Sequence, residues 1–387
     1  MDDYLTNTLN LLKSKNYVNL TIVLGNESCD LDSAVSALVY ASFLHWQHQN
    51  MKCRVCTRTK RDDSSYKDDI FVAMFDVDRK DYALKTEVAF CLKEHGVNEK
   101  LLLFRDDIDI KSVVADEKTN IVLVDHHVLS RKFEFLAPNV TEIIDHRPID
   151  NSNWRYRDDV RSTIETVGSC CTLIAQRIRD LCGLMGKEGF FEEFSVCTDM
   201  LHGVIILDTV NFSKDIKKAT PHDEEIVTFL EGILKPKDFE LERKLKLDCL
   251  VASRCDVSSL NAEQLLRKDM KIVGDVFVPS FPILVEEFLK KPKALEAVSE
   301  ALGLKGCSLA VLLGMDLKQG LRRDGALFGE ENKIESLLKL LQEWSSPCLQ
   351  LSPEKMNGCL YFKQLNLSAS RKQYISPINE FLKTYKE

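Results

Sequence analysis

The sequence lacks the features of several protein classes. No apolar run reaches the roughly 18 residues that a membrane-spanning helix needs. The first residues, MDDYLTNTLN, contain neither the apolar core of a signal peptide nor an Arg-rich transit pattern. Internal repeats, low-complexity tracts and heptad series are absent as well. These absences predict a cytoplasmic globular protein that has no membrane partner.

A surplus of positive charge is also missing. The net charge of −8 argues against general nucleic-acid binding. The two parts of the chain differ, however, because residues 1–235 hold 29 basic against 39 acidic residues, whereas residues 236–387 hold 23 against 21. The acidic surplus therefore lies in the first part of the chain and a slight basic surplus in the second.

Paired cysteine motifs are scarce. The thirteen cysteines, in a chain without a secretory signal, predict mostly reduced thiols rather than a disulfide framework. Cys53 and Cys56 have CxxC spacing, but no second pair follows them, so we do not predict a zinc site there.

The chain has enough length and apolar content for two domains. Of its 387 residues, 44% are apolar and 29% charged, which is typical of globular proteins. The first part alternates β-branched runs with helical stretches such as 33–46, a pattern that predicts an α/β domain whose parallel sheet carries helices on both faces. We expect this domain at 1–235, a connection at 236–257 and a smaller mixed α/β domain at 258–387. Its expected helices are 261–269, 283–291 and 332–344, and its expected strands are 271–278, 308–317 and late strands within 348–366.

Five apolar runs in the first part end on ionisable residues. Because ligands bind beyond the carboxyl ends of parallel strands, we expect these side chains to meet if each run is a strand. The runs and the residues that follow them are TIVL with Asp30 and Asp32, LLLF with Asp106 and Asp107, IVLV with Asp125, His126 and His127, TEII with Asp145 and His146, and GVIIL with Asp208.

Such a gathering of carboxylates indicates bound metal. Ionised carboxylates that are close together in a dry cleft need raised pKa values or a cation. Carboxylate oxygens with one imidazole suit Mn²⁺, Mg²⁺ or Co²⁺, and a pair of such ions activates water against phosphorus. The alternative for a single residue such as Asp32 is that it caps the following helix. Asp106 and Asp107 have no neighbouring histidine and are open to interpretation as a loop.

The motifs resemble the prune branch of the DHH phosphoesterases, which is related to family II inorganic pyrophosphatases. GNESCDLDS, LVDHH, IIDHRPI, VGSC and IILDTVNF occur in that family's order, and SASRKQY resembles the SRK motif of its DHHA2 domain. The resemblance covers nearly the whole chain. It implies a hydrolase that releases terminal phosphate from short-chain inorganic polyphosphate, or from another small phosphate anhydride, with a water activated by two divalent ions, Mn²⁺ or Mg²⁺.

The same resemblance implies roles for individual residues. The metal ligands would be Asp30, Asp32, Asp125, His146 and Asp208, with Asp125 as the bridge between two ions. Asp125, His126 and His127 form the implied catalytic motif. Arg147, Lys218, Arg371 and Lys372 would bind phosphate.

Asn26 departs from the pyrophosphatase pattern, which has a histidine ligand here. The departure favours exopolyphosphatase activity and a preference for Mg²⁺, unless Asn26 is only a turn residue. Two other functions stay open: a cyclic AMP phosphodiesterase, and an interaction protein that keeps weak hydrolase activity. Protein partners are compatible with the sequence but cannot be identified from it.

Overall fold

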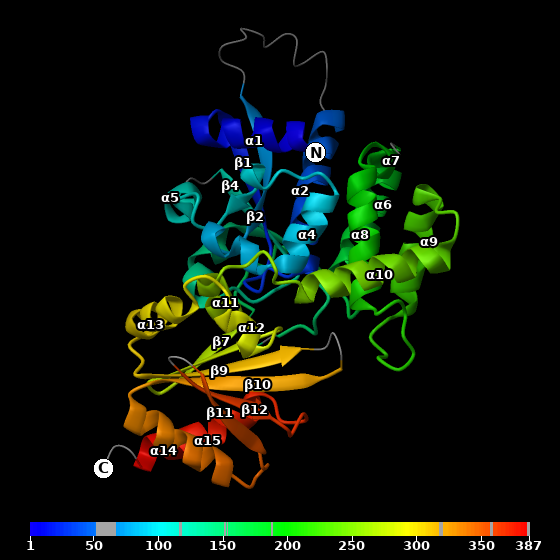
Figure 1. The fold of residues 1–387 in the computed structure, drawn as a ribbon. Coiled ribbons are helices and arrows are strands. Elements are labelled where there is room, and N and C mark those ends of the chain that lie inside the picture. The colour runs from blue at the N-terminus through cyan, green and yellow to red at the C-terminus, as the bar shows by residue number, and fades with distance from the viewer. Residues whose placement is uncertain are drawn as a thin grey trace. The chain divides into compact units, whose positions relative to one another are not determined.

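The computed structural model describes residues 1–51, 67–115, 118–150, 152, 154–186, 189–316, 320–356 and 359–384. Cys53 and Cys56 lie outside these ranges. The chain divides into two compact units, Met1–Arg254 and Cys255–Glu387 (Figure 1). The expected connection at 236–257 consists largely of one helix, α10 (Phe239–Cys255). None of the helices in the described ranges combines the length and the apolar character needed to cross a bilayer.

The N-terminal unit is built on a six-stranded parallel sheet with the strand order β3-β2-β1-β4-β5-β6. The strands are β1 (Tyr17–Leu24), β2 (Asp68–Phe75), β3 (Leu103–Phe104), β4 (Thr119–Val124), β5 (Val140–Asp145) and β6 (Arg161–Ile164). Besides α10, the α-helices that the structure describes in this unit are α1 (Asp2–Ser14), α2 (Leu31–Met51), α4 (Thr86–Glu94), α5 (Ile110–Val114), α6 (Cys170–Met185), α7 (Phe190–Glu193), α8 (Ser195–Asp208) and α9 (Pro221–Leu234).

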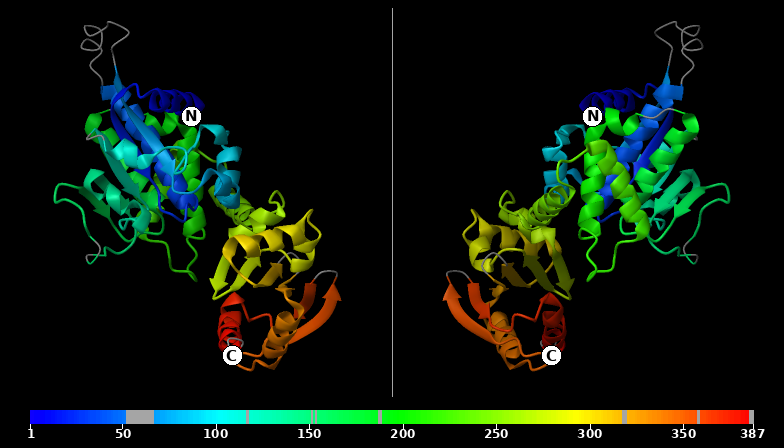
Figure 2. Two further views of the ribbon diagram at one scale, coloured as in Figure 1. Left: turned by 90° about the vertical axis from the view of Figure 1, so that its left-hand side faces the viewer. Right: turned by 90° about the vertical axis from the view of Figure 1, so that its right-hand side faces the viewer.

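Both faces of this sheet are covered (Figure 2). Consecutive strand residues point to opposite faces, so Val23 and Val122 pack with helices α2, α6 and α8, while Ile22 and Ile121 pack against α5 and the short helical segment Arg131–Asn139. Burial on both sides explains why these strands are continuous apolar runs. The predicted fold class is confirmed.

One of the five predicted strands is wrong. The run GVIIL at 203–207 is the last part of helix α8. Most side chains of this helix are buried, Cys197 and Met200 among them, so it has no polar face that would reveal a helical period. Asp208 therefore ends a helix. Of the predicted run LLLF, only the two residues of β3 form a strand, whereas the eight-residue strand β2 was not singled out by the sequence pattern.

The C-terminal unit contains a six-stranded mixed sheet in the order β11-β12-β10-β9-β8-β7. Among its described strands, β8 and β9 pair in parallel and the other neighbours pair in antiparallel fashion. The strands are β7 (Met270–Val273), β8 (Val276–Phe281), β9 (Leu309–Asp316), β10 (Arg322–Gly329), β11 (Leu351–Met356) and β12 (Cys359–Gln364). The helices are α11 (Ala262–Lys268), α12 (Val285–Leu289), α13 (Ala294–Lys305), α14 (Glu331–Glu343) and α15 (Arg371–Thr384).

The single strand predicted at 271–278 is also wrong. It is a hairpin, in which β7 and β8 pair in antiparallel fashion around Gly274 and Asp275. Gly274 has a φ of 59°, a left-handed conformation that glycine adopts without steric strain and that tight hairpin turns require.

Candidate metal centre

The candidate site lies where the strand order of the N-terminal sheet reverses. β1 lies between β2 and β4, and the chain leaves β1 and β4 toward opposite sides of the sheet, which is the position at which ligands bind in such folds. The loop after β1 leads into α2, whose first turn carries Asp32. Asp125 directly follows β4, and His146 directly follows β5. Three chain segments thus deliver polar side chains to one edge.

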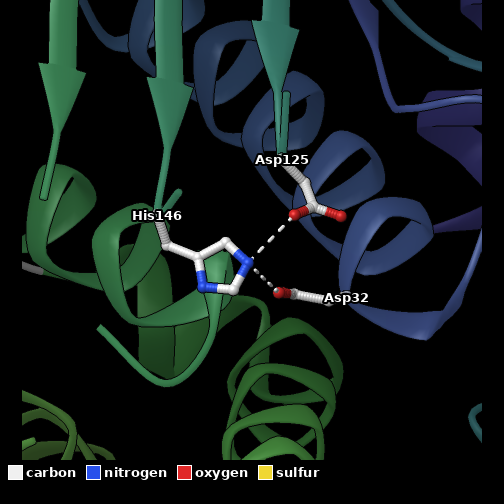
Figure 3. A group of neighbouring side chains, drawn as sticks. All are labelled: Asp32, Asp125 and His146. Atoms are coloured by element: carbon white, nitrogen blue, oxygen red, sulfur yellow. Dashed lines mark ion pairs between the residues drawn. The ribbon is translucent and has the colours of Figure 1, made fainter. Parts of the chain in front are cut away.

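Asp32, Asp125 and His146 point toward one another in Figure 3. The Nε2 atom of His146 lies 3.3 Å from Oδ1 of Asp125 and 3.8 Å from Oδ2 of Asp32. One potential ligand atom from each residue lies within 4.8 Å of the other two. Two carboxylates and one imidazole around a common point are a donor set that suits Mn²⁺ or Mg²⁺.

The imidazole of His146 is oriented for metal binding. Its Nδ1 lies 3.0 Å from the carbonyl oxygen of Val167, so Nδ1 carries the proton and donates it to that carbonyl. Nε2 therefore faces the two carboxylates. A histidine ligand held through its other nitrogen is the usual arrangement in metal sites.

Asp32 is fixed by the beginning of helix α6. Its carboxylate accepts hydrogen bonds from the Ser169 hydroxyl at 2.9 Å, from the Cys170 amide at 2.7 Å and from the Cys171 amide at 2.9 Å. The first amides of a helix lack partners within the helix and favour a negative charge. Sequence reasoning missed this support, although Ser169 before an apolar helix is a recognisable N-cap signal.

Asp30 and Asp208 lie outside the cluster of three. Asp30 caps helix α2, because its Oδ1 accepts from the Ser33 amide at 3.1 Å. Its Oδ2 accepts from the Ser28 hydroxyl at 2.9 Å. The capping that the sequence suggested for Asp32 thus belongs to Asp30. Asp208 lies at the end of α8, with Oδ1 3.6 Å from Nζ of Lys218.

The protonation behaviour of the cluster shows that negative charge is in excess. Burial, reinforced by the charge of Asp32, raises the pKa of Asp125 to about 8. Burial and Asp32 likewise raise the pKa of Asp208 to about 7, although Lys218 opposes the shift. Burial lowers the pKa of His146, but its bond to Asp125 and the charge of Asp32 outweigh that effect and bring the pKa to about 9. A cation placed here would relieve this repulsion.

Asn26 contacts Asp125 directly. Its amide nitrogen donates to Oδ2 of Asp125 at 2.7 Å, and its amide oxygen accepts from the amides of Ser28 and Cys29. The oxygen therefore shapes the turn after β1 while the nitrogen holds the carboxylate. Asp125 itself has a φ of 60°, a conformation that is uncommon outside glycine and often found at functional sites.

The two histidines of the LVDHH motif are buried beside the cluster rather than within it. Nδ1 of His126 lies 2.9 Å from the Val124 carbonyl oxygen, and burial lowers the pKa of this imidazole. His127 bonds through Nδ1 to Asp145 at 2.5 Å and accepts the Asp150 amide at Nε2. Both nitrogens of His127 are thereby used to hold the loop that follows β5.

The predicted basic residues occupy both units. In the N-terminal unit, the half-exposed Arg147 places a guanidinium nitrogen 3.5 Å from Oδ1 of Asp125, and Lys218 is the neighbour of Asp208. In the C-terminal unit, Arg371 begins helix α15 and pairs with Asp269 at 2.7 Å, while Lys372 is exposed. Asp106 and Asp107, which the sequence left open, bind Arg79 in a loop at the end of β3.

Comparisons with known proteins agree with the motifs. Residues 20–206 match the model of the DHH family, N-terminal domain, and residues 248–381 match that of the DHHA2 domain. The exopolyphosphatase PRUNE1 of Rattus norvegicus is 32% identical over 398 residues, covering 100% of this chain and 80% of the relative. A candidate exopolyphosphatase of Schizosaccharomyces pombe is 26% identical, covering 94% of this chain and 91% of the relative.

Among solved structures, a candidate family II inorganic pyrophosphatase of Methanococcus jannaschii covers 94% of this chain and 99% of its own, with 19% identity and a TM-score of 0.44. The similarity to PRUNE1 over the whole of this chain, together with the two family domains in order, decides the classification. This chain belongs to the DHH family of metal-dependent phosphoesterases and is homologous to the PRUNE1 exopolyphosphatases.

Proposed function

We propose that this protein is an exopolyphosphatase, which hydrolyses the terminal phosphoanhydride bond of short-chain inorganic polyphosphate. The main observation behind this proposal is the arrangement of Asp32, Asp125 and His146 around one point. Arg147 contacts Asp125 and Lys218 contacts Asp208 at the border of this arrangement. Acidic groups for cations beside basic groups for phosphate oxygens are what metal-assisted phosphoanhydride hydrolysis requires. The exopolyphosphatase names of the relatives support the same substrate class.

Two divalent ions, Mn²⁺ or Mg²⁺, are the proposed cofactors. Asp30, Asp32, Asp125, His146 and Asp208 would hold them, with Asp125 shared between the two. Bound there, the ions would supply an activated water and neutralise charge on the phosphate. The side chains fit this use, because Asp32 is held by helix amides and His146, held through Nδ1, directs its Nε2 toward the two carboxylates.

The chain's own cations bind the substrate in this proposal. The Arg147 guanidinium is half exposed, and its 3.5 Å distance from Asp125 lets it reach both the carboxylate and a phosphate oxygen. Lys218 is similarly exposed beside Asp208. Arginine forks onto two phosphate oxygens, whereas lysine supplies a mobile point charge. Arg371 and Lys372 add a second basic pair, so that residues 258–387 act as a substrate-binding domain and residues 1–235 as the metal domain.

Supporting roles fall to the remaining motif residues. His127 fixes Asp145, whose other oxygen accepts the amides of His146 and Arg147. Asn26 fixes Asp125. These residues therefore orient the groups that meet metal and phosphate.

The test is hydrolysis of triphosphate, long-chain polyphosphate, pyrophosphate and cyclic AMP, measured side by side with Mg²⁺ and then with Mn²⁺. Phosphate release is the readout for the first three substrates, and AMP formation is the readout for cyclic AMP. We expect triphosphate to be the best substrate. Cyclic AMP hydrolysis with no turnover of triphosphate would favour a nucleotide phosphodiesterase instead. Hydrolysis no faster than that of Asp125→Ala on every substrate would favour an interaction protein.

A further inference from the structure

A second carboxylate lies behind the site and contacts none of the proposed metal ligands. Asp223, in the first turn of helix α9, has no solvent exposure. With Thr220 it forms a capping box, in which its Oδ2 accepts the Thr220 amide and hydroxyl, each at 2.7 Å. It also accepts the Gly168 amide, at 2.9 Å and 3.1 Å to its two oxygens, and the Thr172 hydroxyl at 2.6 Å. The capping box explains the contacts of Asp223 with Thr220, but it does not explain the contacts with Gly168 and Thr172.

Through its contacts with Gly168 and Thr172, Asp223 supports the turn that fixes Asp32. Gly168 immediately precedes Ser169, whose hydroxyl binds Asp32 as the amides of Cys170 and Cys171 do. One short turn is therefore held between two buried carboxylates, Asp223 behind it and Asp32 in front. A shift of this turn would carry the donors that fix Asp32 with it.

Through its capping contacts with Thr220, Asp223 also holds the loop that carries Lys218. Thr220 ends the loop that begins after Asp208 and carries Lys218 beside that carboxylate. Near the start of this loop, Val210 and Asn211 have φ values of 50° and 49°, conformations that a β-branched residue such as valine adopts only when its surroundings impose them. The bond of Asp223 to Thr220 closes the far end of this strained loop.

At Gly168, the turn that supports Asp32 packs against the loop that carries Lys218. A Cβ atom placed on this glycine would lie 2.6 Å from the methyl carbon of Thr209 and 3.0 Å from Oδ2 of Asp223. Thr209 follows Asp208 directly, so the turn that supports Asp32 packs tightly against the beginning of the loop as well as against Asp223.

We infer that Asp223 is a positioning residue of the active site, which sets Asp32 through the start of α6 and Lys218 through the end of the loop. All its partners are N–H or O–H donors, and an ionised carboxylate, which only accepts, matches them. An amide of the same shape would present an NH₂ group to some of those donors and displace them. The Lys218 part of this inference rests on the proposed function, whereas the Asp32 part concerns metal binding alone.

The test compares Asp223→Asn with Glu231→Gln. Glu231 lies on the same helix, is also buried, and accepts bonds from Arg243 and His202, away from the candidate ligands. Mn²⁺ binding is measured by calorimetry without substrate, and triphosphate kinetics are measured at saturating Mn²⁺. We expect Asp223→Asn to weaken Mn²⁺ binding about tenfold or more, the usual effect of losing outer support for a ligand. Its KM should rise through Lys218, whereas Glu231→Gln should keep both constants within about twofold.

A milder variant protects the test against misfolding. Thr172→Val removes one hydrogen bond of Asp223 and keeps the side-chain volume, so a smaller loss of Mn²⁺ affinity is expected. Wild-type Mn²⁺ affinity in Asp223→Asn, or in Thr172→Val should Asp223→Asn not fold, would overturn the inference. A wild-type protein that binds Mn²⁺ but releases no phosphate would refute the proposed function and leave the metal comparison decisive. Absence of Mn²⁺ binding in the wild type would overturn both.

Discussion

Two polar clusters of the N-terminal unit, each with buried carboxylates, contain similar residues in opposite electrostatic states. One is the metal cluster, Asp32, Asp125 and His146. The other, which we call the helix network, joins helices α8, α9 and α10 and the residue that follows α4 through side-chain contacts of 2.5–3.0 Å. Its members are His95, Asp199, His202, Glu231, Arg243 and Lys246.

In the helix network the chain supplies its own cations. Burial alone would raise the pKa of Asp199, but its bonds with His95 and Lys246 hold that pKa well below the ordinary value. Arg243 and His202 likewise lower the pKa of Glu231 against the effect of burial. In the metal cluster burial prevails, and the pKa of Asp125 is raised to about 8. Burial of carboxylates therefore does not by itself indicate a metal site. Buried carboxylates that have too few cations beside them do indicate one.

The largest expected effect comes from removing the central carboxylate of the metal cluster. Asp125→Ala should lower kcat/KM on triphosphate at least about 100-fold, because both proposed ions lose a ligand. The metal-free protein should be as stable as the wild type or more so, since repulsion with Asp32 is relieved. Kinetics at saturating Mn²⁺ and urea unfolding with a chelator measure the two effects. A variant that retains most of the wild-type turnover would exclude a bridging role for Asp125.

The corresponding change in the helix network should act on stability instead. Glu231→Ala leaves the Arg243 guanidinium and His202 buried without their partner, so we expect a loss of about 3 kcal/mol in the free energy of unfolding. Mn²⁺ affinity should stay the same. Urea unfolding beside Glu242→Ala, an exposed position on α10, provides the measurement and its control. Equal stabilities of the two variants would contradict the view that this network stabilises the fold through its own ion pairs.

The basic pair of the C-terminal unit is expected to affect substrate rather than metal. Arg371→Ala and Lys372→Ala should each lower kcat/KM on triphosphate by roughly tenfold, the size of a hydrogen bond to a charged group. Metal affinity should be unchanged, because neither residue is a proposed ligand. Lys383→Ala, an exposed lysine on the same helix, is the matched control. If all three variants behave alike, the phosphate-binding role of residues 258–387 is refuted.

The sequence predicted the position of the metal cluster better than its supports. Asp125 and His146 follow apolar runs that are strands, and the geometry of parallel sheets brings such ends together. Asp208 follows an apolar run that is a helix, which the sequence could not distinguish because the helix is buried on most sides. The roles of Ser169 and Asn26 depend on contacts between segments 99 or more residues apart. No local pattern encodes such contacts, so they required the structure.

The smallest expected effect is the pH dependence of stability that His95 gives to the helix network. His95 donates to Asp199 at 2.9 Å and also contacts the Cys91 carbonyl. Burial opposes its protonation, but the bond with Asp199 prevails and the pKa rises to about 10. A histidine whose folded pKa exceeds its ordinary value of about 6.5 stabilises the protein fully below that value, and this contribution is lost as the pH rises through the folded pKa.

Wild-type stability should therefore fall between pH 7 and pH 10 by about 1 kcal/mol more than that of His95→Gln, a modest amount because the pair is partly exposed and Lys246 continues to neutralise Asp199. Urea unfolding of both proteins at the two pH values measures the difference. Lysine titration near pH 10 affects both proteins alike, so the difference between their slopes isolates His95. Parallel slopes would mean that His95 is neutral in the folded protein, and that Lys246 alone supplies the cation that Asp199 requires.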